Sequence, residues 1–436
     1  MSENLPRRGF LLGTLGVGLG MAGVARADPA PLPPPPIPIP PLPAPTYTPL
    51  NYHSPALKPC VDELPIPETR AATGELAAMS GAHRYHRDLP ETRSWGFGRD
   101  VLGPNLEAWR DRVARIAFHN ELGTHVLAPH VDLTMHGVTE RDRTDPRFTV
   151  HLHGGANAPD ADGHPLVGWR NGGGPRFTYT NRQEAAALWY HDHTMGITRL
   201  NIQAGLAGIY YVRDEFDTGR DDNPLGLPSG EFEIPLIVQD RTFNPDGSLQ
   251  PMVATYIPEG YNQSGQVGDV ACVNGKVWLL LRVRRTLYRF RILNGSNSRP
   301  YIFEFSNGMP CWAIGTDLGL LDTAVPTPSI RVSPGEQWDI VNSTPFDHPI
   351  HLHLARLRVI GRQPILTSAY WLANTPPAFG TRWTPSADPF AIGPQQGPPP
   401  WEVGWKDTIE CPPTPSPESW CTGPRSRIST STPTPP

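Results

Sequence analysis

Seven of the fifteen histidines fall in three short clusters, and they are the residues of this chain best suited to chemistry. They are His151, His153, His191, His193, His348, His351 and His353. On a β-strand, residues i and i+2 point to the same face, so each His-x-His pair directs two imidazoles into one space. Imidazole is a ligand for copper, zinc, iron and nickel. The three pairs therefore predict a multi-histidine metal site, because so many buried imidazoles would otherwise be unpaired.

The other eight histidines show no such pairing. We expect them to be surface residues or hydrogen-bonded structural residues. They are His53, His83, His86, His119, His125, His130, His136 and His164. Gly154 and Gly155 directly follow the first pair, where a missing side chain lets backbone pass close to a metal.

The composition excludes several classes of protein. Lys and Arg number 37 and Asp and Glu 42, a net charge of -5, so neither a basic nucleic-acid binder nor a polybasic membrane patch is indicated. The five cysteines are too few for a disulfide scaffold. Cys60, Cys272 and Cys311 could supply one disulfide in an oxidising compartment, with the pairing open.

The body of the chain, residues 50–410, favours short strands over helices. The chain has 54 prolines in all, and those in the body suit strands and loops. Runs such as 287–292 alternate apolar and polar residues as a half-buried strand does. We predict an all-β chain of consecutive β-sandwich domains at 50–215, 216–336 and 337–410, of which the third is short. One short helix is expected around residues 67–80, where Glu, Ala and Leu dominate.

Both ends of the chain have unusual compositions. Residues 1–27 combine Arg7-Arg8, an apolar stretch and Ala25-Arg26-Ala27, which predicts a cleaved twin-arginine export signal and a periplasmic or extracellular location. Residues 28–49 predict a semi-rigid proline-rich linker. The Pro/Ser/Thr composition of 411–436 predicts a disordered tail.

Several motifs resemble those of the multicopper oxidases, which are built from three cupredoxin-like Greek-key sandwich domains. The resemblance spans roughly residues 55–410 and is strongest to the spore-coat laccase, bilirubin oxidase and aminophenol oxidase (phenoxazinone synthase) subgroup. The motifs are HLHGG (151–155), WYHDHTMGITRLN (189–201), AGLAGIY (204–210), VNGKVW (273–278), RILNGSNSR (291–299), IGTDLGLL (314–321), HPIHLHL (348–354) and GWKDT (404–408).

The resemblance implies copper and assigns each histidine a role. His151 and His351 match the ligands of the type 2 copper, and His348 matches one ligand of the type 1 copper. The four that match ligands of the type 3 copper pair are His153, His191, His193 and His353. All of these except His348 are the expected catalytic residues. The implied activity is oxidation of phenols, aminophenols or bilirubin-like aromatics, with dioxygen reduced to water.

The chain departs from the family pattern in its last third. No histidine follows His353, so the His-Cys-His strand of the family, with the type 1 cysteine, is missing. Residues 333–336 and 337–342 are adjacent, whereas matching segments of relatives lie well apart. We hypothesise an internal deletion near residue 336 and a frameshift near 411. A truncated third domain and impaired activity are therefore expected.

Two further hypotheses compete with a copper oxidase. One is a non-catalytic exported structural protein on the same fold. The other is a copper-sequestering protein that uses only His151 and His351, although a chain with 7 Met offers no Met-rich segment to support it. The intact first motifs favour the oxidase lineage. Its partners would be a small aromatic reductant, dioxygen and the twin-arginine export machinery, with no nucleic acid and no membrane.

Overall fold

The computed structural model describes residues 53–251, 267–327, 329–332, 348–351, 353, 356–374, 387–411 and 422–431. The export signal predicted at 1–27 and the linker predicted at 28–49 lie outside these residues. Most regular elements are strands, so the prediction of an all-β chain is confirmed. The described part contains no helix that is both long and apolar enough to span a membrane.

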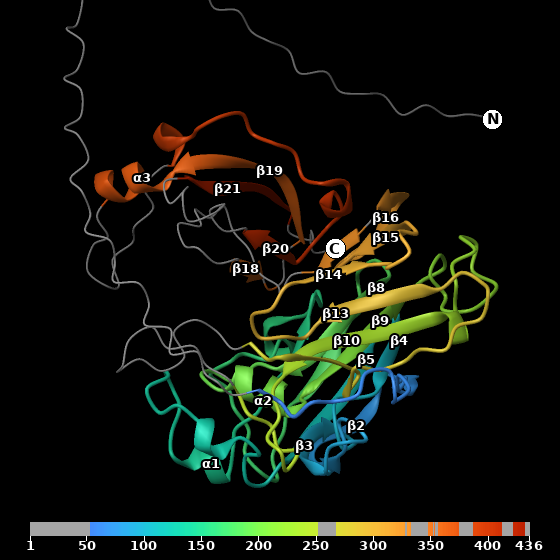
Figure 1. Cartoon of the computed structure of the whole chain (residues 1–436), viewed down its shortest axis with the longest axis vertical. Coiled ribbons are helices and arrows are strands. Elements are labelled where there is room, and N and C mark those ends of the chain that lie inside the picture. The colour runs from blue at the N-terminus through green and yellow to red at the C-terminus, as the bar shows by residue number, and fades with distance from the viewer. Residues whose placement is uncertain are drawn as a thin grey trace, which may run out of the picture. The chain divides into compact units, whose positions relative to one another are not determined.

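Two sheets form the first sandwich (Figure 1). The five-stranded sheet contains, in spatial order, β1 (Thr69–Ala71), β4 (Asn105–Trp109), β9 (Ala207–Arg213), β8 (Ala186–Asp192) and β6 (Val150–His153). The four-stranded sheet contains β3 (Thr92–Phe97), β2 (Gly74–His83), β5 (Ala114–Glu121) and β7 (Arg176–Tyr179). Helices α1 (Arg141–Thr144) and α2 (Thr198–Ala204) lie in the connections.

Inward-facing residues of both sheets meet in one apolar core. Trp95, Phe97, Phe118 and Tyr190 are all at most 1% exposed there. The short helix expected at 67–80 is wrong, because this segment forms β1 and the first part of β2. Burial decided the outcome, since alternate residues of β2 face this core and tertiary packing overrides a weak helix propensity.

The next region is a second set of strands. Its four-stranded sheet has the order β12 (Lys276–Val277), β11 (Val270–Val273), β10 (Glu233–Arg241) and β13 (Arg289–Asn294). Two further two-stranded sheets pair β14 (Tyr301–Glu304) with β17 (Ser329–Val332), and β15 (Cys311–Thr316) with β16 (Gly319–Thr327).

Cys60, Cys272 and Cys311 are free thiols in this structure, so they do not form the disulfide that the sequence allowed.

A buried ionic network joins the first sandwich to the second sheet. Arg213, at the end of β9, makes a two-pronged ion pair with Glu233, at the start of β10, with a closest N–O distance of 2.9 Å. Arg289 and Arg291 of β13 both reach Asp217 at 2.6 Å. Such pairing is needed wherever charges are taken out of water.

The C-terminal region consists of two strand pairs and one helix, α3 (Thr367–Ala373). Strand β18 (His348–His351) pairs with β20 (Thr408–Cys411), and the long β19 (Arg356–Leu366) pairs with β21 (Thr422–Ser431) (Figure 1). The prediction of a disordered tail is wrong for 422–431. Main-chain hydrogen bonds to a neighbouring strand need no aliphatic side chains, and the composition of the tail did not reveal this pairing.

Candidate metal centre

Strands β6 and β8 supply the first half of the centre through their register. They are antiparallel, and His151 pairs directly with His191 while His153 pairs with Trp189. Directly opposed residues share a face of the sheet, so these four rings lie together. The intervening pair, Leu152 and Tyr190, points to the other face and is buried in the sandwich core. The alternation of side chains along β6 and β8 therefore places the imidazoles on one face of the sheet and the apolar core residues on the other.

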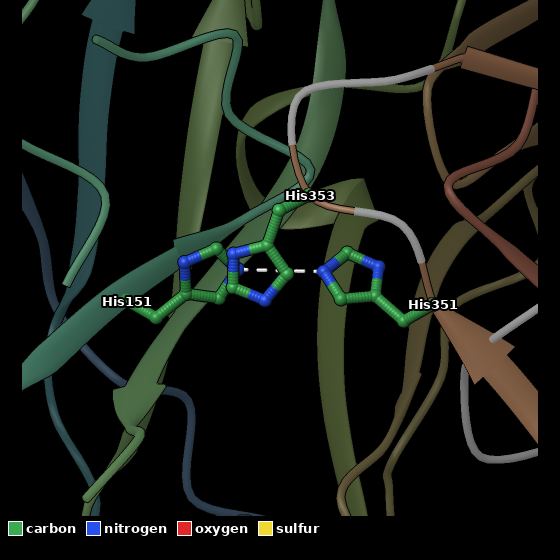
Figure 2. A group of neighbouring side chains, drawn as sticks. All are labelled: His151, His351 and His353. Atoms are coloured by element: carbon green, nitrogen blue, oxygen red, sulfur yellow. Dashed lines mark hydrogen bonds between the residues drawn. The ribbon is translucent and has the colours of Figure 1, made fainter. Parts of the chain in front are cut away.

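The second half comes from β18, about 200 residues further along the chain. His351 ends this strand and His353 follows two residues later. Figure 2 shows both rings directed at His151. The ring of His353 stacks on that of His151 with centroids 4.0 Å apart, and the ring of His351 stacks on that of His153 at 3.6 Å. The structure therefore brings together histidines that the sequence keeps far apart.

Six of the seven predicted ligands lie in this cluster. His193, just after β8, is the most peripheral of the first-sandwich histidines, with its ring 5.2 Å from that of His151 and 5.1 Å from that of His353. The seventh, His348, pairs through its backbone with Cys411 across β18 and β20, but its side chain lies outside the described part of the chain.

Hydrogen bonds determine which nitrogen each imidazole presents. The Nδ1 atoms of His151, His191 and His351 donate to the backbone carbonyls of Asp162, Asp192 and Asp407, at 2.7, 2.7 and 3.2 Å. A carbonyl oxygen only accepts, so each Nδ1 carries the proton and each Nε2 has an unprotonated lone pair, which in His191 accepts from Nδ1 of His153 at 3.3 Å. The Nε2 atoms of His151 and His351 lie 3.4 Å apart, as the dashed line in Figure 2 marks.

Two carboxylates lie close to imidazole nitrogens of the cluster. Asp162 accepts a hydrogen bond from Nδ1 of His353 at 2.7 Å. Asp407 lies 3.7 Å from Nε2 of His153 and 3.9 Å from Nδ1 of His351. Gly154 is required here, because its φ is +83° and a Cβ atom would lie 2.5 Å from the Asp407 carboxylate. Carboxylates in this position orient metal-binding histidines.

Burial keeps the imidazoles neutral, the form that binds metal. Desolvation, reinforced by neighbouring imidazoles, holds the pKa values of His153 and His191 well below the usual value, and it lowers the pKa of His193 to about 4. Burial opposes ionisation of Asp162, but hydrogen bonds with His151 and His353 outweigh it and leave its pKa well below normal. The centre therefore presents uncharged donors beside an anion.

This donor set fits copper. Three groups of potential ligands have all their donor atoms within 4.8 Å of one another: His151 with His351 and His353, His151 with His153 and His191, and His153 with His351 and Asp407. A nitrogen pair 3.4 Å apart can bind one ion, because metal–imidazole bonds are about 2.0–2.1 Å long. Each of these groups has the donor atoms for one ion, and the three groups overlap at His151, His153 and His351.

Two of the remaining histidines, His125 and His83, are buried and hydrogen-bonded, as the sequence predicted. His125 donates from Nε2 to Asn201 at 3.0 Å and accepts at Nδ1 from the Leu127 amide, and burial lowers its pKa to about 3. His83 contacts Asp100 at 2.5 Å and the carbonyl of Gly275 at 2.7 Å. Both are structural residues outside the cluster.

Three residues of the centre had no role predicted from the sequence. Asp162 carries no signal there, because it meets its histidines only through the fold. Asp407 belongs to the GWKDT motif, but the motif does not show that this residue lies beside His153. Trp189 stacks on His191 with ring centroids 3.9 Å apart. Trp189 stands two residues before His191 on an expected strand, so the sequence did indicate that the two side chains share a face. The pairing of Trp189 with His153 across β6 and β8 became evident only in the structure.

The fold and the histidine cluster together define a copper protein of the multicopper oxidase family, and the chain belongs to this family. Sequence profiles described as "Multicopper oxidase" match residues 138–217 and 299–416. These matches contain all seven predicted ligand positions. The family implies copper as the cofactor.

Among characterised relatives, the chain is 37% identical over 308 residues to a laccase of Bacillus subtilis (strain 168), covering 65% of this chain and 59% of the relative. It is 36% identical over 330 residues to a laccase of Haloferax volcanii, covering 69% and 54%. The chain thus spans less than two thirds of the length of these relatives.

Solved structures support the cupredoxin-like fold. A multicopper oxidase from Pediococcus acidilactici superposes with a TM-score of 0.64 at 20% identity, covering 89% of both chains. A multicopper oxidase from Aquifex aeolicus gives a TM-score of 0.61 at 20% identity, covering 86% of this chain and 93% of its own. At this identity the likeness concerns the fold alone.

Proposed function

We propose that this chain is a copper-dependent oxidase that takes electrons from phenols, aminophenols or similar aromatics and reduces dioxygen to water. The observation that carries the proposal is the convergence of six imidazoles from β6, β8 and the β18 segment on one buried centre. Bound copper would supply one-electron redox chemistry and coordination sites for dioxygen. The laccase relatives support the reaction class.

We propose the following division of the ligands, which follows the family pattern. His151 and His351 hold a type 2 copper, and the type 3 pair is held by His153, His191, His193 and His353. The backbone-bonded Nδ1 atoms of His151, His191 and His351 support this role, because they leave Nε2 unprotonated. Asp162 keeps the His353 ring oriented, and its lowered pKa keeps the carboxylate ionised beside the centre.

We propose that His348 is the one type 1 ligand position that residues 1–436 supply. We propose that the third domain at 337–410 is partial, next to domains at 50–215 and 216–336. Without the soft thiolate that suits fast electron transfer, turnover of phenols is expected to be slow. Export through the twin-arginine route is part of the same proposal.

Copper titration of the purified full chain tests the proposal. We expect binding of more than one copper per chain, an electron paramagnetic resonance signal of type 2 copper without the blue absorption of a copper thiolate, and slow dioxygen uptake with 2-aminophenol. The variant His151→Ala should lose the type 2 signal, whereas His119→Ala, on β5 outside the cluster, should keep it. A chain that binds no copper contradicts the proposal.

The non-catalytic alternative makes a different prediction. It requires a folded chain whose copper content has no effect on dioxygen uptake. A sequestering protein that uses His151 and His351 alone would keep its copper affinity in a His191→Ala variant. The direct pairing of His191 with His151 argues against that separation.

A further inference from the structure

A cavity of about 290 Å³ adjoins the histidine cluster. His153 and Trp189 lie in its wall beside β13, the β15–β16 strand pair and residues 401–408. This volume is at the small end of ligand pockets, so the cavity fits a molecule of one ring better than a larger one. Neither the proposed ligands nor the family assignment gives it a role.

Aromatic side chains line the cavity on several sides. They are Trp189, Phe290, Trp312 and Trp401. Trp312 is 54% exposed, so an aromatic ring is accessible at the opening to solvent. Flat apolar walls of this kind pack best against a planar guest, since aromatic rings attract one another in offset or edge arrangements.

Most charged groups in the wall are already paired, whereas Asp407 lies against the neutral imidazoles of His153 and His351. Three cations, Arg289, Arg291 and Lys406, accompany three carboxylates, Asp317, Glu402 and Asp407. The two arginines are engaged in the buried ionic network. Lys406 pairs with Asp317 at 3.1 Å and Glu402 with Arg362 at 2.6 Å. The three cations are thus all engaged, so no free cation is left for an anionic guest and the wall favours a neutral guest over an anion.

One polar group in the wall still has capacity to bind. Oδ2 of Asp317 is buried and has no hydrogen-bond partner among the described residues, while Oδ1 receives the Lys406 ammonium. A buried acceptor left in this state costs stability, and a hydroxyl or amine donor on a ligand would satisfy it.

Trp189 connects the cavity to the centre. Its indole forms part of the wall and stacks on the His191 imidazole, with centroids 3.9 Å apart and planes inclined by 26°. Its ring centroid is 5.0 Å from that of His153. A ring lodged against Trp189 is therefore separated from a proposed copper ligand by one indole.

We propose that this cavity binds a neutral, single-ring phenol or aminophenol, packed against Trp189 and Trp312 and donating a hydrogen bond to Asp317. The inference rests on the proposed function, because this guest would be the reductant of the oxidase. It places the reductant beside β8 and β15.

The test is a titration of the metal-free full chain with 2-aminophenol without oxygen, followed by tryptophan fluorescence and calorimetry. We expect saturable quenching with one site per chain. Trp312→Ala should weaken binding about three- to tenfold, and because this side chain is mostly exposed the fold should be retained. Leu320→Trp, which fills the cavity, should abolish binding.

The matched control is Met309→Trp, which adds the same indole at a side chain that is 51% exposed and not part of the cavity wall. It should bind as the unsubstituted chain does. Circular dichroism verifies the fold of each variant, and Trp312→Ala carries the test if Leu320→Trp does not fold. The proposal is overturned if the unsubstituted chain shows no saturable binding, or if a folded cavity variant binds unchanged.

Failure of this inference can be told apart from failure of the oxidase proposal. If 2-aminophenol binds the metal-free chain but copper gives no dioxygen uptake, the cavity proposal stands and the oxidase proposal falls. If the copper-loaded Leu320→Trp variant consumes dioxygen with 2-aminophenol at the unsubstituted rate, the oxidase proposal stands and the cavity is not the reductant site.

Discussion

The first sandwich and the C-terminal region contribute histidines to the same centre, but the two regions differ in the burial of these histidines and in the apolar core beneath them. The side chain of His151 is 1% exposed and that of His353 is 32% exposed. The first sandwich has a core that extends through both of its sheets. In the described C-terminal region, the buried apolar cluster is Ile365, Tyr370 and Ala387.

This difference indicates which half of the centre is preorganised. His151 and His191 are held by a strand pair whose other face is core. His351 and His353 follow a short strand and are held by hydrogen bonds to Asp407 and Asp162. We infer that the C-terminal half depends on the centre itself for much of its order, and the predictions below test that asymmetry.

The largest effect is expected for Phe97→Ala. Phe97 is fully buried between Phe118 and Tyr190, so its loss should lower the free energy of unfolding by about 3–5 kcal/mol. Tyr370→Ala, in the C-terminal cluster, should leave the main denaturant transition in place and instead speed proteolysis within 356–411. Equal effects of the two substitutions on the main transition would contradict the asymmetry.

The next largest effect is expected in the ionic network. Asp217→Asn removes the partner that Arg289 and Arg291 share, which leaves buried charge uncompensated and should cost about 3 kcal/mol of unfolding free energy. The control is Glu140→Gln, which removes the exposed pair with Arg143 and should change stability by less than about 1 kcal/mol. Urea titrations of both variants make the comparison.

Copper should stabilise the C-terminal region more than the first sandwich. Copper at a hundred times its dissociation constant adds about 2.7 kcal/mol to any unfolding that releases it. Unfolding of the 348–411 segment releases the ligands His351 and His353. Protection from proteolysis should therefore rise mainly in this segment, and His351→Ala should remove it. Protection spread evenly over the chain would count against the inference.

The smallest effect is the response to acid. Burial raises the pKa of Asp217, but the arginines outweigh it and hold its folded-state pKa well below the usual value. Below pH about 4 the unfolded chain therefore takes up the proton first, and stability falls by up to about 1.4 kcal/mol per pH unit. Between pH 5 and 7 this group should have no effect. Asp217→Asn should flatten the acid limb of the melting-temperature profile.

The sequence determined the fold class and the chemistry of the site. Alternation in short strands predicted an all-β chain, and the His-x-His spacing predicted paired imidazoles on one face, because strand geometry links residues i and i+2 directly. The predictions for residues 67–80 and 422–431 were wrong, because both segments pair with strands elsewhere in the chain and this pairing overrode their local composition. A composition signal cannot report a partner strand that lies elsewhere in the chain.

Only the tertiary structure decided which groups surround the imidazoles. The approach of His351 to His151 and the hydrogen bonds of His353 to Asp162 and of His351 to Asp407 all join segments separated by tens to hundreds of residues. The sequence predicted candidate ligands, because the type of donor atom is a local property of a side chain. Their unprotonated lone pairs, neutral charge and neighbouring cavity result from packing, which no local spacing encodes.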